Sequence, residues 1–270
     1  MLVIGFCNQK GGVGKTTSAI NLSAEFANLG YKILLVDLDP QGSASSGLGV
    51  DVKDKNDNRA DIYNLFFGET TIEELILPST VQNLDVVPSN PDLVGLEIEI
   101  GKKPGRELIL RSQLISLKDR YDLVFIDCPP SSGLLTLNAM GAADGLLVPL
   151  QTEYYALEGI SALMNTLNFV KQTFNPNLYI LGVFLTMYDS RTKLSAQVAE
   201  EARKFFNQIL FREVIPRNIK ISESPSHGMP IREYDPNSTG ALAYYKLAKE
   251  IESRLIEQFG ISSEQKTIAV

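Results

Sequence analysis

Residues 8–22 read NQKGGVGKTTSAINL and set three glycines among two lysines and two threonines. They match the phosphate-binding pattern G-x-x-x-x-G-K-[ST] except at its first position, where Gln9 replaces the expected glycine and a second lysine, Lys10, follows. Glycines let backbone N–H groups approach phosphate oxygens closely, and the positive end of a following helix dipole favours the same anion. The stretch therefore predicts a nucleotide-phosphate loop; a glycine turn that only joins a strand to a helix is the alternative.

The polar side chains at the end of this loop suit a magnesium-bound nucleoside triphosphate. The ammonium of Lys15 would reach the β- and γ-phosphates, the hydroxyl of Thr16 would face Mg²⁺, and the hydroxyl of Thr17 would face the α-phosphate. ATP and Mg²⁺ are therefore the predicted cofactors. The loop contributes the predicted nucleotide-binding residues Lys10, Gly11, Gly12, Val13, Gly14, Lys15, Thr16 and Thr17.

Aspartates at the ends of two other apolar segments would complete a metal site. Asp127 ends DLVFID and would hold Mg²⁺ through water, unless it only caps the following turn. Asp37 and Asp39 lie two residues apart in VDLDPQG, and because strand side chains alternate, they would point to one side. One would support the Mg²⁺ shell and the other would orient the attacking water; solvated surface acids are the alternative. The predicted metal set is Thr16, Asp39 and Asp127.

These residues must be positioned by a repeating pattern of strands and helices. Continuous apolar segments rich in β-branched residues predict strands buried on both faces, over 2–8, 32–39, 84–89, 121–130, 145–151 and 178–187. Apolar residues spaced three or four apart predict helices over 15–29, 106–118, 133–142, 155–173, 193–207 and 237–258. The alternation predicts the α/β class, with a mostly parallel central sheet, helices on both faces and ligands beyond the carboxyl ends of the strands.

The composition limits the class of protein. With 270 residues, 44% hydrophobic and 21% charged, the chain can bury a full core and predicts one domain over 1–260 with a flexible tail over 261–270. We expect the polar stretch 49–61 to be a solvated loop rather than a linker. The sequence contains neither a run of about 18 apolar residues nor a cleavable amino-terminal signal, so we expect no membrane span and a cytoplasmic protein.

Cysteine, histidine and net charge add weaker constraints. Two cysteines are too few for a disulfide framework. Cys7 and Cys128 each end an apolar run, which favours buried thiols; an iron–sulfur site shared across a dimer is the alternative. The single histidine, His227, lies in the turn-rich stretch SPSHGMP and is expected to be a loop residue. The net charge of −7 argues against general polyanion binding but leaves room for a local basic face.

Five blocks of this sequence resemble the ParA type of deviant-Walker ATPases. That family includes the Soj partitioning ATPases and, more distantly, MinD and the nitrogenase iron protein. The blocks are KGGVGKTT at 10–17, LLVDLDPQGSASSGLG at 34–49, YDLVFIDCPPSSGLLTLNA at 121–139, VPLQTEYYALEG at 148–159 and VIPRNIKISESPSHGMPI at 214–231. Because they are spread over nearly the whole chain, the resemblance covers the predicted fold as well as the loop.

The resemblance implies what the unusual loop does. In this family the residue that Lys10 matches reaches across a nucleotide-sandwich homodimer to phosphate bound by the partner subunit, much as an arginine finger acts in trans. The implied activity is ATP hydrolysis. Residues 37–47 match the first switch segment, and residues 127–136 match the second. Pro216 matches a loop beside the adenine and joins the nucleotide-binding set. The implied catalytic residues are Lys10, Lys15 and Asp39.

The resemblance also implies partners. In partitioning relatives the ATP-bound dimer binds double-stranded DNA without sequence preference, and a ParB-like adapter with a basic amino-terminal peptide stimulates hydrolysis. Such a protein would be associated with the nucleoid, and no membrane partner is expected. The predicted DNA-binding residues are Arg191, Lys193, Arg217 and Lys220, with Arg232 as a looser candidate.

Three other roles share much of this sequence. A membrane-cycling ATPase similar to MinD uses a basic amphipathic carboxyl-terminal helix, whereas this chain ends in AKEIESRLIEQFGISSEQKTIAV, which is of mixed charge. The cysteine positions disfavour an iron–sulfur enzyme on the same scaffold. An ATPase that positions a protein assembly instead of DNA would share every residue above and differ only in its partner.

Overall fold

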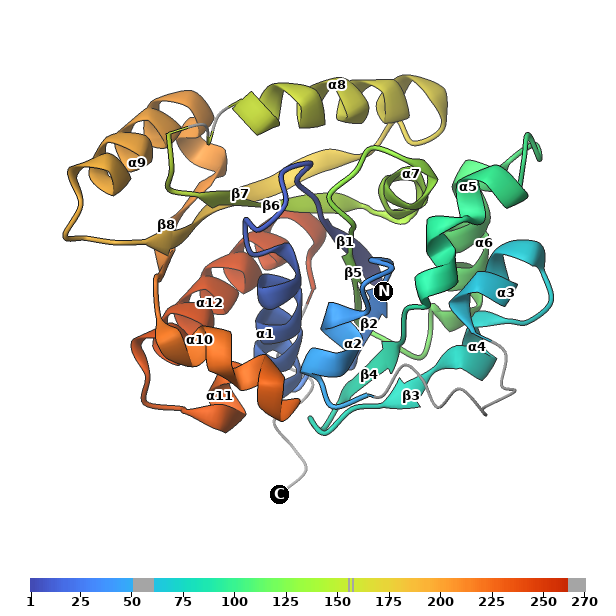
Figure 1. The fold of residues 1–270 in the computed structure, drawn as a ribbon, viewed down its shortest axis with the longest axis horizontal. Coiled ribbons are helices and arrows are strands. Elements are labelled where there is room, and N and C mark those ends of the chain that lie inside the picture. Colours follow the sequence, from blue (N-terminus) through green and yellow to red (C-terminus); the bar gives the residue numbers. More distant parts are fainter. Residues whose placement is uncertain (51–60, 155, 157, 262–270) are drawn as a thin grey trace.

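The computed structural model describes residues 1–50, 61–154, 156 and 158–261. The expected solvated loop over 49–61 and the expected tail over 261–270 fall almost wholly outside these residues. Within the described ranges the chain forms an eight-stranded sheet in the order β3-β4-β2-β5-β1-β6-β7-β8, with helices on both faces (Figure 1). In this sheet β3 pairs antiparallel with β4, and the other neighbouring strands pair in parallel. The predicted α/β class is confirmed.

The predicted strands are all present, and their ends shift by at most a few residues. Two further strands, at either edge of the sheet, were not predicted: β3, which is only two residues long, and β8, whose apolar run is interrupted by charged residues. The strands are β1 (Leu2–Phe6), β2 (Ile33–Asp37), β3 (Leu77–Pro78), β4 (Leu84–Val87), β5 (Leu123–Asp127), β6 (Gly145–Gln151), β7 (Tyr179–Tyr188) and β8 (Leu210–Pro216).

The long helices also follow the prediction, whereas several short ones were missed. In the described part of the chain no helix combines the length and apolar character needed to cross a bilayer. The helices are α1 (Lys15–Asn28), α2 (Ser43–Gly47), α3 (Ile62–Phe67), α4 (Ile72–Leu75), α5 (Leu96–Glu99), α6 (Ile109–Leu114), α7 (Leu134–Ala142), α8 (Glu158–Thr173), α9 (Lys193–Phe206), α10 (Ile219–Glu223), α11 (Ile231–Tyr234) and α12 (Thr239–Phe259).

The predicted helix over 106–118 is wrong in detail. It consists of a 3₁₀ turn at Arg106–Leu108, the short helix α6 and a second 3₁₀ turn at Ile115–Leu117. The side chain of Asn138 in α7 donates to the carbonyl of Arg106 at 2.8 Å and accepts the N–H of Leu110 at 3.1 Å. A tertiary contact therefore takes backbone groups that a continuous helix would use.

Two apolar clusters, one on each face, hold the helices on the sheet. Successive strand residues alternate between the clusters: in β5, Val124 and Ile126 face α3 to α9, whereas Leu123 and Phe125 face α1, α2 and α10 to α12. Burying each such side chain contributes roughly 1.5–3 kcal/mol. The continuous apolar runs that predict the strands are therefore also what holds both helical layers in place.

Three strand ends lie in register at one edge of the sheet. Phe6 of β1 pairs with Asp127 of β5, and Asp127 pairs with Asp37 of β2. After β1 the chain moves to β2 on one side of the sheet, and it later adds β6, β7 and β8 on the other. Such a switch point is where open α/β sheets bind ligands, beyond the carboxyl ends of their strands.

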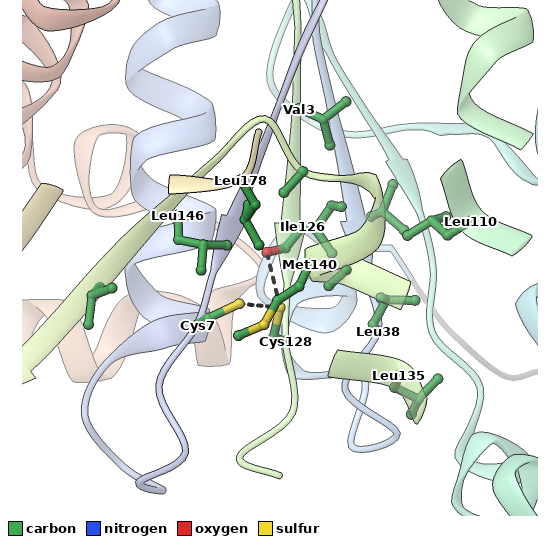
Figure 2. Packing of buried hydrophobic residues seen from close by; sticks show 14 of the residues in the cluster. Val3, Cys7, Leu38, Leu110, Ile126, Cys128, Leu135, Met140, Leu146 and Leu178 are labelled. Atoms are coloured by element: carbon green, nitrogen blue, oxygen red, sulfur yellow. Dashed lines mark hydrogen bonds between the residues drawn. The ribbon is translucent and has the colours of Figure 1, made fainter. Parts of the chain in front are cut away.

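The two cysteines directly follow two of these strand ends and are buried in the core. The Sγ atoms of Cys7 and Cys128 are 3.1 Å apart, within the apolar cluster that includes Met140 and Leu146 (Figure 2). The hydrogen bond to Cys7 and burial together raise the pKa of the Cys128 thiol well above its usual range. Both cysteines are buried, as predicted. An iron–sulfur site shared across a dimer would need thiolates at a surface, so the structure gives that alternative no support.

Candidate active site

The phosphate loop joins the end of β1 to the first turn of α1. Gly12 and Gly14 have φ values of +74° and +89°, a left-handed conformation that glycine adopts without steric cost. Gly14 is also the N-cap of α1, and no side chain caps that end. The first N–H groups of α1 have no intrahelical acceptor, so they form the positive end of the helix beside the loop. This geometry suits a bound phosphate.

Internal hydrogen bonds fold the loop around Lys15. The ammonium of Lys15 donates to the carbonyl oxygen of Lys10 at 3.2 Å, and the hydroxyl of Thr186 in β7 donates to the carbonyl of Val13 at 2.8 Å. Burial lowers the pKa of Lys15, and the nearby carboxylate of Asp127 opposes that shift. The loop therefore holds a buried cation at its centre.

Asp127 is a buried carboxylate, and neither of its oxygens has a hydrogen-bond partner in the described part of the chain. Burial raises its pKa well above the usual range and Asp37 raises it further, whereas the hydroxyl of Thr16 and the ammonium of Lys15 act in the opposite direction. An unsatisfied buried carboxylate is unfavourable unless a ligand compensates it. The orphaned carboxylate and the hydroxyl of Thr16 are hard oxygen donors of the kind Mg²⁺ prefers.

The protein donors at this place are few. Among the described residues, no group of three or more His, Cys, Asp or Glu side chains could hold a metal ion. A cation here would need nucleotide phosphate and water as its remaining ligands, which is how Mg²⁺ is usually bound in nucleotide sites.

The two aspartates of VDLDPQG have different surroundings. Asp37 is buried; its Oδ2 accepts the N–H and hydroxyl of Ser45 at 2.9 and 2.7 Å, and its Oδ1 accepts the N–H of Asp39 at 3.2 Å. Burial raises the pKa of Asp37 to about 6, and these hydrogen bonds oppose the shift. Asp39 is only partly buried, and its Oδ1 accepts the N–H of Gln41 at 3.0 Å. Asp37 therefore braces the segment 37–47, and Asp39 is the carboxylate nearer the surface.

Lys10 lies at the start of the loop and is ion-paired with Glu153, just beyond the end of β6. The two side chains are 31% and 38% exposed. The N–H of Lys10 donates to Oδ1 of Asn8 at 3.0 Å, and the amide of Asn8 donates to the carbonyl of Pro149 at 2.9 Å. Sequence reasoning gave no role to Asn8 or Glu153. The position of Glu153 beyond a predicted strand end was the signal that could have indicated it.

A cavity of about 470 Å³ opens beside the loop. Its size is within the range of small-molecule pockets, roughly 300–1,000 Å³. Pro216, which the resemblance places beside the adenine, is part of its lining. The lining includes Gly14, Thr17, Thr186, Met187, Pro216 and Tyr244.

Three of the predicted DNA-binding residues gather where β7 and β8 end. The N–H of Arg217 donates to the carbonyl of Tyr188 at 3.0 Å, which brings Arg217 beside the segment that carries Arg191. Arg191 is 84% exposed and bonds both carboxylate oxygens of Asp189, at 2.9 and 2.8 Å. Lys193 is exposed at the start of α9. This corner of the surface holds three cations and one acid that partly neutralises them.

The remaining basic candidates make contacts within the subunit. Lys220 pairs with Glu223 at 2.9 Å, and Arg232 pairs at 2.7 Å with Glu25, which is buried in α1. Burial raises the pKa of Glu25, and Arg232 opposes that shift. Arg232 therefore holds α11 against α1, a structural use that weakens its candidacy for DNA.

Comparison with known proteins extends these observations. A protein-family profile described as "AAA domain" (AAA_31) matches residues 1–180. The sporulation initiation inhibitor protein Soj of Bacillus subtilis is 49% identical over 249 residues, which cover 92% of this chain and 97% of Soj. The chromosome partitioning protein ParA of Myxococcus xanthus is 49% identical over 253 residues, covering 93% of this chain and 88% of ParA.

A solved structure shares the fold over almost the whole length. Cobyrinic acid a,c-diamide synthase from Mycobacterium smegmatis, with bound ADP and magnesium, superimposes with a TM-score of 0.81 at 32% identity, covering 97% of each chain. That protein binds a nucleotide and magnesium together.

Proposed function

The chain belongs to the ParA/Soj family of P-loop ATPases, and from that premise we propose that it is the Mg-ATP-dependent dimerising ATPase of a DNA partition system. Its ATP-bound sandwich homodimer binds DNA non-specifically on the nucleoid, and hydrolysis stimulated by a ParB-like adapter releases it. The observation that carries the proposal is the convergence of the loop 10–17, Asp39 and Asp127 at the carboxyl ends of three adjacent strands. The partition names of relatives at 49% identity support the DNA-linked output.

Each residue of the site then has a role in ATP binding or hydrolysis. The loop N–H groups and Lys15 bind the phosphates, and the cavity beside Pro216 receives the base. Thr16 would supply its hydroxyl to Mg²⁺ and Asp127 would hold the ion through water; when bound, the ion neutralises phosphate charge. Asp39, the more accessible aspartate, orients the attacking water.

Lys10 makes hydrolysis depend on pairing of two subunits. In a single subunit its ammonium is satisfied by Glu153. In the homodimer it exchanges that carboxylate for phosphate oxygens bound by the partner subunit, where negative charge increases in the transition state. ATP therefore holds the dimer together, and loss of the γ-phosphate releases it.

Pairing also explains how ATP could control DNA binding. The net charge of −7 works against DNA, and the four candidate cations of one subunit are the exposed Arg191, Lys193 and Arg217 and the half-buried, ion-paired Lys220. Two subunits held rigidly together present twice that number at high effective concentration. ATP then switches DNA affinity without contacting DNA.

The decisive experiment is fluorescence anisotropy of a labelled, arbitrary-sequence DNA duplex titrated with the Asp39→Ala protein. We expect tight binding with Mg-ATP, no binding with Mg-ADP, and affinity that falls steeply between two salt concentrations. Arg217→Glu in the same background is the matched control, which should retain ATP-dependent dimers but lose DNA binding. If the Asp39→Ala protein dimerises with ATP and still binds no DNA, the output of the switch is a protein assembly or a membrane.

A further inference from the structure

The side chain of Gln9 ties the start of the phosphate loop to α8. Its Nε2 donates to the carbonyl of Ala162 at 3.2 Å and to the hydroxyl oxygen of Thr166 at 2.8 Å. Thr166 in turn donates its hydroxyl proton to the same carbonyl of Ala162 at 3.2 Å. Since a carbonyl only accepts, the NH₂ group of the Gln9 side chain, and not its oxygen, must face the helix.

The neighbours of Gln9 immobilise the same stretch from two other directions. Asn8 accepts the N–H of Lys10 and is itself anchored on β6 through Pro149. The first turn of α8 lies beside this stretch: a Cβ at Gly159 would be in ordinary van der Waals contact with Oδ1 of Asn8 at 3.4 Å and with Cβ of Lys10 at 3.6 Å. The backbone around Lys10 is therefore held between β6 and α8.

We propose that Gln9 is a positioning residue, and that its bond to Thr166 fixes the direction in which Lys10 leaves the loop. This inference rests on the proposed function, in which Lys10 acts on nucleotide in the partner subunit. A long, flexible lysine reaches a distant phosphate efficiently only if its backbone is fixed beforehand, because ordering it at the moment of pairing weakens association. Gln9 stands where the common loop pattern has glycine, so its side chain supplies a tether that glycine could not.

The tether should affect pairing but not nucleotide binding within one subunit. Residues that bind phosphate in the same subunit, from Gly12 to Thr17, are fixed by α1 and by Thr186 and make no contact with Gln9 among the described hydrogen bonds; the ammonium of Lys15 reaches this stretch only at the backbone carbonyl of Lys10. Loss of the tether should therefore weaken ATP-dependent dimerisation about 10-fold, which corresponds to about 1.4 kcal/mol, with unchanged affinity for ATP.

The experiment compares side-chain changes at both ends of the tether in the Asp39→Ala protein. Gln9→Leu removes the donor at similar size, and Thr166→Val removes the acceptor at similar shape. Thr166→Ser keeps the hydroxyl and should behave like the parent. Thr173→Val is the matched control. Thr173 lies at the carboxyl end of the same helix and donates to the carbonyl of Phe169 as Thr166 does to that of Ala162, but Thr173 is exposed.

Two quantities are measured for each variant: affinity for fluorescent mant-ATP, and the dimer dissociation constant in Mg-ATP by sedimentation velocity. We expect Gln9→Leu and Thr166→Val to keep ATP affinity within about 2-fold and to raise the dimer dissociation constant about 10-fold, and the double variant to be no worse than either single one. Unchanged dimerisation, or equal losses of dimerisation and ATP affinity, would overturn the inference. If the Asp39→Ala parent itself fails to dimerise with ATP, both the inference and the proposed function fail.

Discussion

At the scale of single residues, the site holds a buried carboxyl group whose oxygens have no hydrogen-bond partner among the described residues. Asp127 is enclosed by β1, β2 and β5 without a hydrogen-bond partner in the described chain, although its neighbour Asp37 has three. Burial of this kind disfavours the ionised carboxylate. The protein therefore sacrifices some stability to keep a reactive oxygen donor beside the loop.

We expect Asp127→Asn to abolish Mg-dependent hydrolysis and to gain stability relative to the parent as pH rises, because an amide does not ionise. The folded-state pKa of Asp127 is raised, so the stability of the parent falls as pH rises above about 4, the unfolded carboxyl pKa, toward the folded pKa. The advantage of the variant should therefore be larger at pH 7 than at pH 4.5. Urea denaturation at both pH values measures the difference between variant and parent, and a difference that is the same at pH 4.5 and pH 7 would contradict this account.

Lys15→Ala should weaken ATP binding about 100-fold or more, because charge-assisted hydrogen bonds to phosphate contribute roughly 1.5–3 kcal/mol each. The change also removes the ammonium that opposes the effect of burial on the Asp127 carboxylate, so we expect some loss of thermal stability without nucleotide. Isothermal titration with ATP measures the affinity. Lys118→Ala, at an exposed position far from the loop, serves as the control, and near-parent ATP affinity in Lys15→Ala would refute the loop assignment.

At the scale of elements, the edge strand β8 depends on a helix for its integrity. Between the pairs Val183–Leu210 and Leu185–Val214, β8 advances four residues while β7 advances two, so β8 bulges. The carboxylate of Glu250 in α12 accepts the N–H groups of Arg212 and Glu213 in this bulge, at 2.8 to 3.1 Å. The side chain of Glu250 thus accepts hydrogen bonds from backbone N–H groups of β8 that do not pair with β7.

Glu250→Ala should destabilise the protein by about 0.5–1.5 kcal/mol, since it removes hydrogen bonds from backbone donors at the sheet edge that water can then solvate. Exposed edge donors also favour pairing with other chains, so the variant should aggregate earlier on heating. Urea denaturation and light scattering during a thermal ramp test the two effects. Glu257→Ala, exposed on the same helix, is the matched control; equal behaviour of the two variants would show that the bulge does not need the carboxylate.

The strand β8 also shows which part of the fold the sequence does not predict. The strands β1, β2 and β5 are continuous apolar runs, so their existence, their parallel pairing and the site at their ends were predictable. In β8, by contrast, Arg212 and Glu213 interrupt the apolar run, because the bulge exposes them and α12 supplies their partner. That partner lies about forty residues away in sequence, where local pattern carries no information.

The candidate site also contains one part that the sequence predicts and one part that it does not. The glycines, Lys15, Thr16 and the strand-end aspartates are recognisable because their spacing is local and their chemistry is specific. The partners of Gln9 and Lys10 are Thr166 and Glu153, more than 140 residues further along the chain. Those contacts depend on the pairing of β6 with β1 and on the place of α8 beside the start of the loop, so only the folded structure could identify them.

At the scale of the whole molecule, the distribution of charge should determine how DNA binding responds to salt. Arg217→Ala removes one exposed cation per subunit from an ATP-bound dimer. The slope of log affinity against log salt concentration should become shallower by about 2, or about 1 for each lost phosphate contact. Anisotropy titrations over a salt series measure the slope, and an unchanged slope would exclude Arg217 from the DNA surface.

Asp189→Asn should strengthen DNA binding, whereas Arg217→Ala weakens it. Asp189 stays ionised in any working buffer, because its hydrogen bonds to Arg191 lower its pKa to about 2. Its charge therefore offsets that of Arg191 at the corner shared with Arg217. Removing the charge should raise DNA affinity about three-fold at roughly 0.1 M salt, where charges within about 10 Å still interact. Weaker binding in the same titration would mean that Asp189 is needed to orient Arg191.

The order of strands in the sheet also determines when the loop can form as the chain is synthesised. The strand that precedes the loop, β1, leaves the ribosome first, but it is bordered by β5 and β6, which end at residues 127 and 151. At about 5–20 residues per second, the apolar β1 waits roughly 6–25 s for its first neighbour. The loop beside β1 can therefore take its final conformation only after β5 has been made, so ATP cannot guide the early steps of folding.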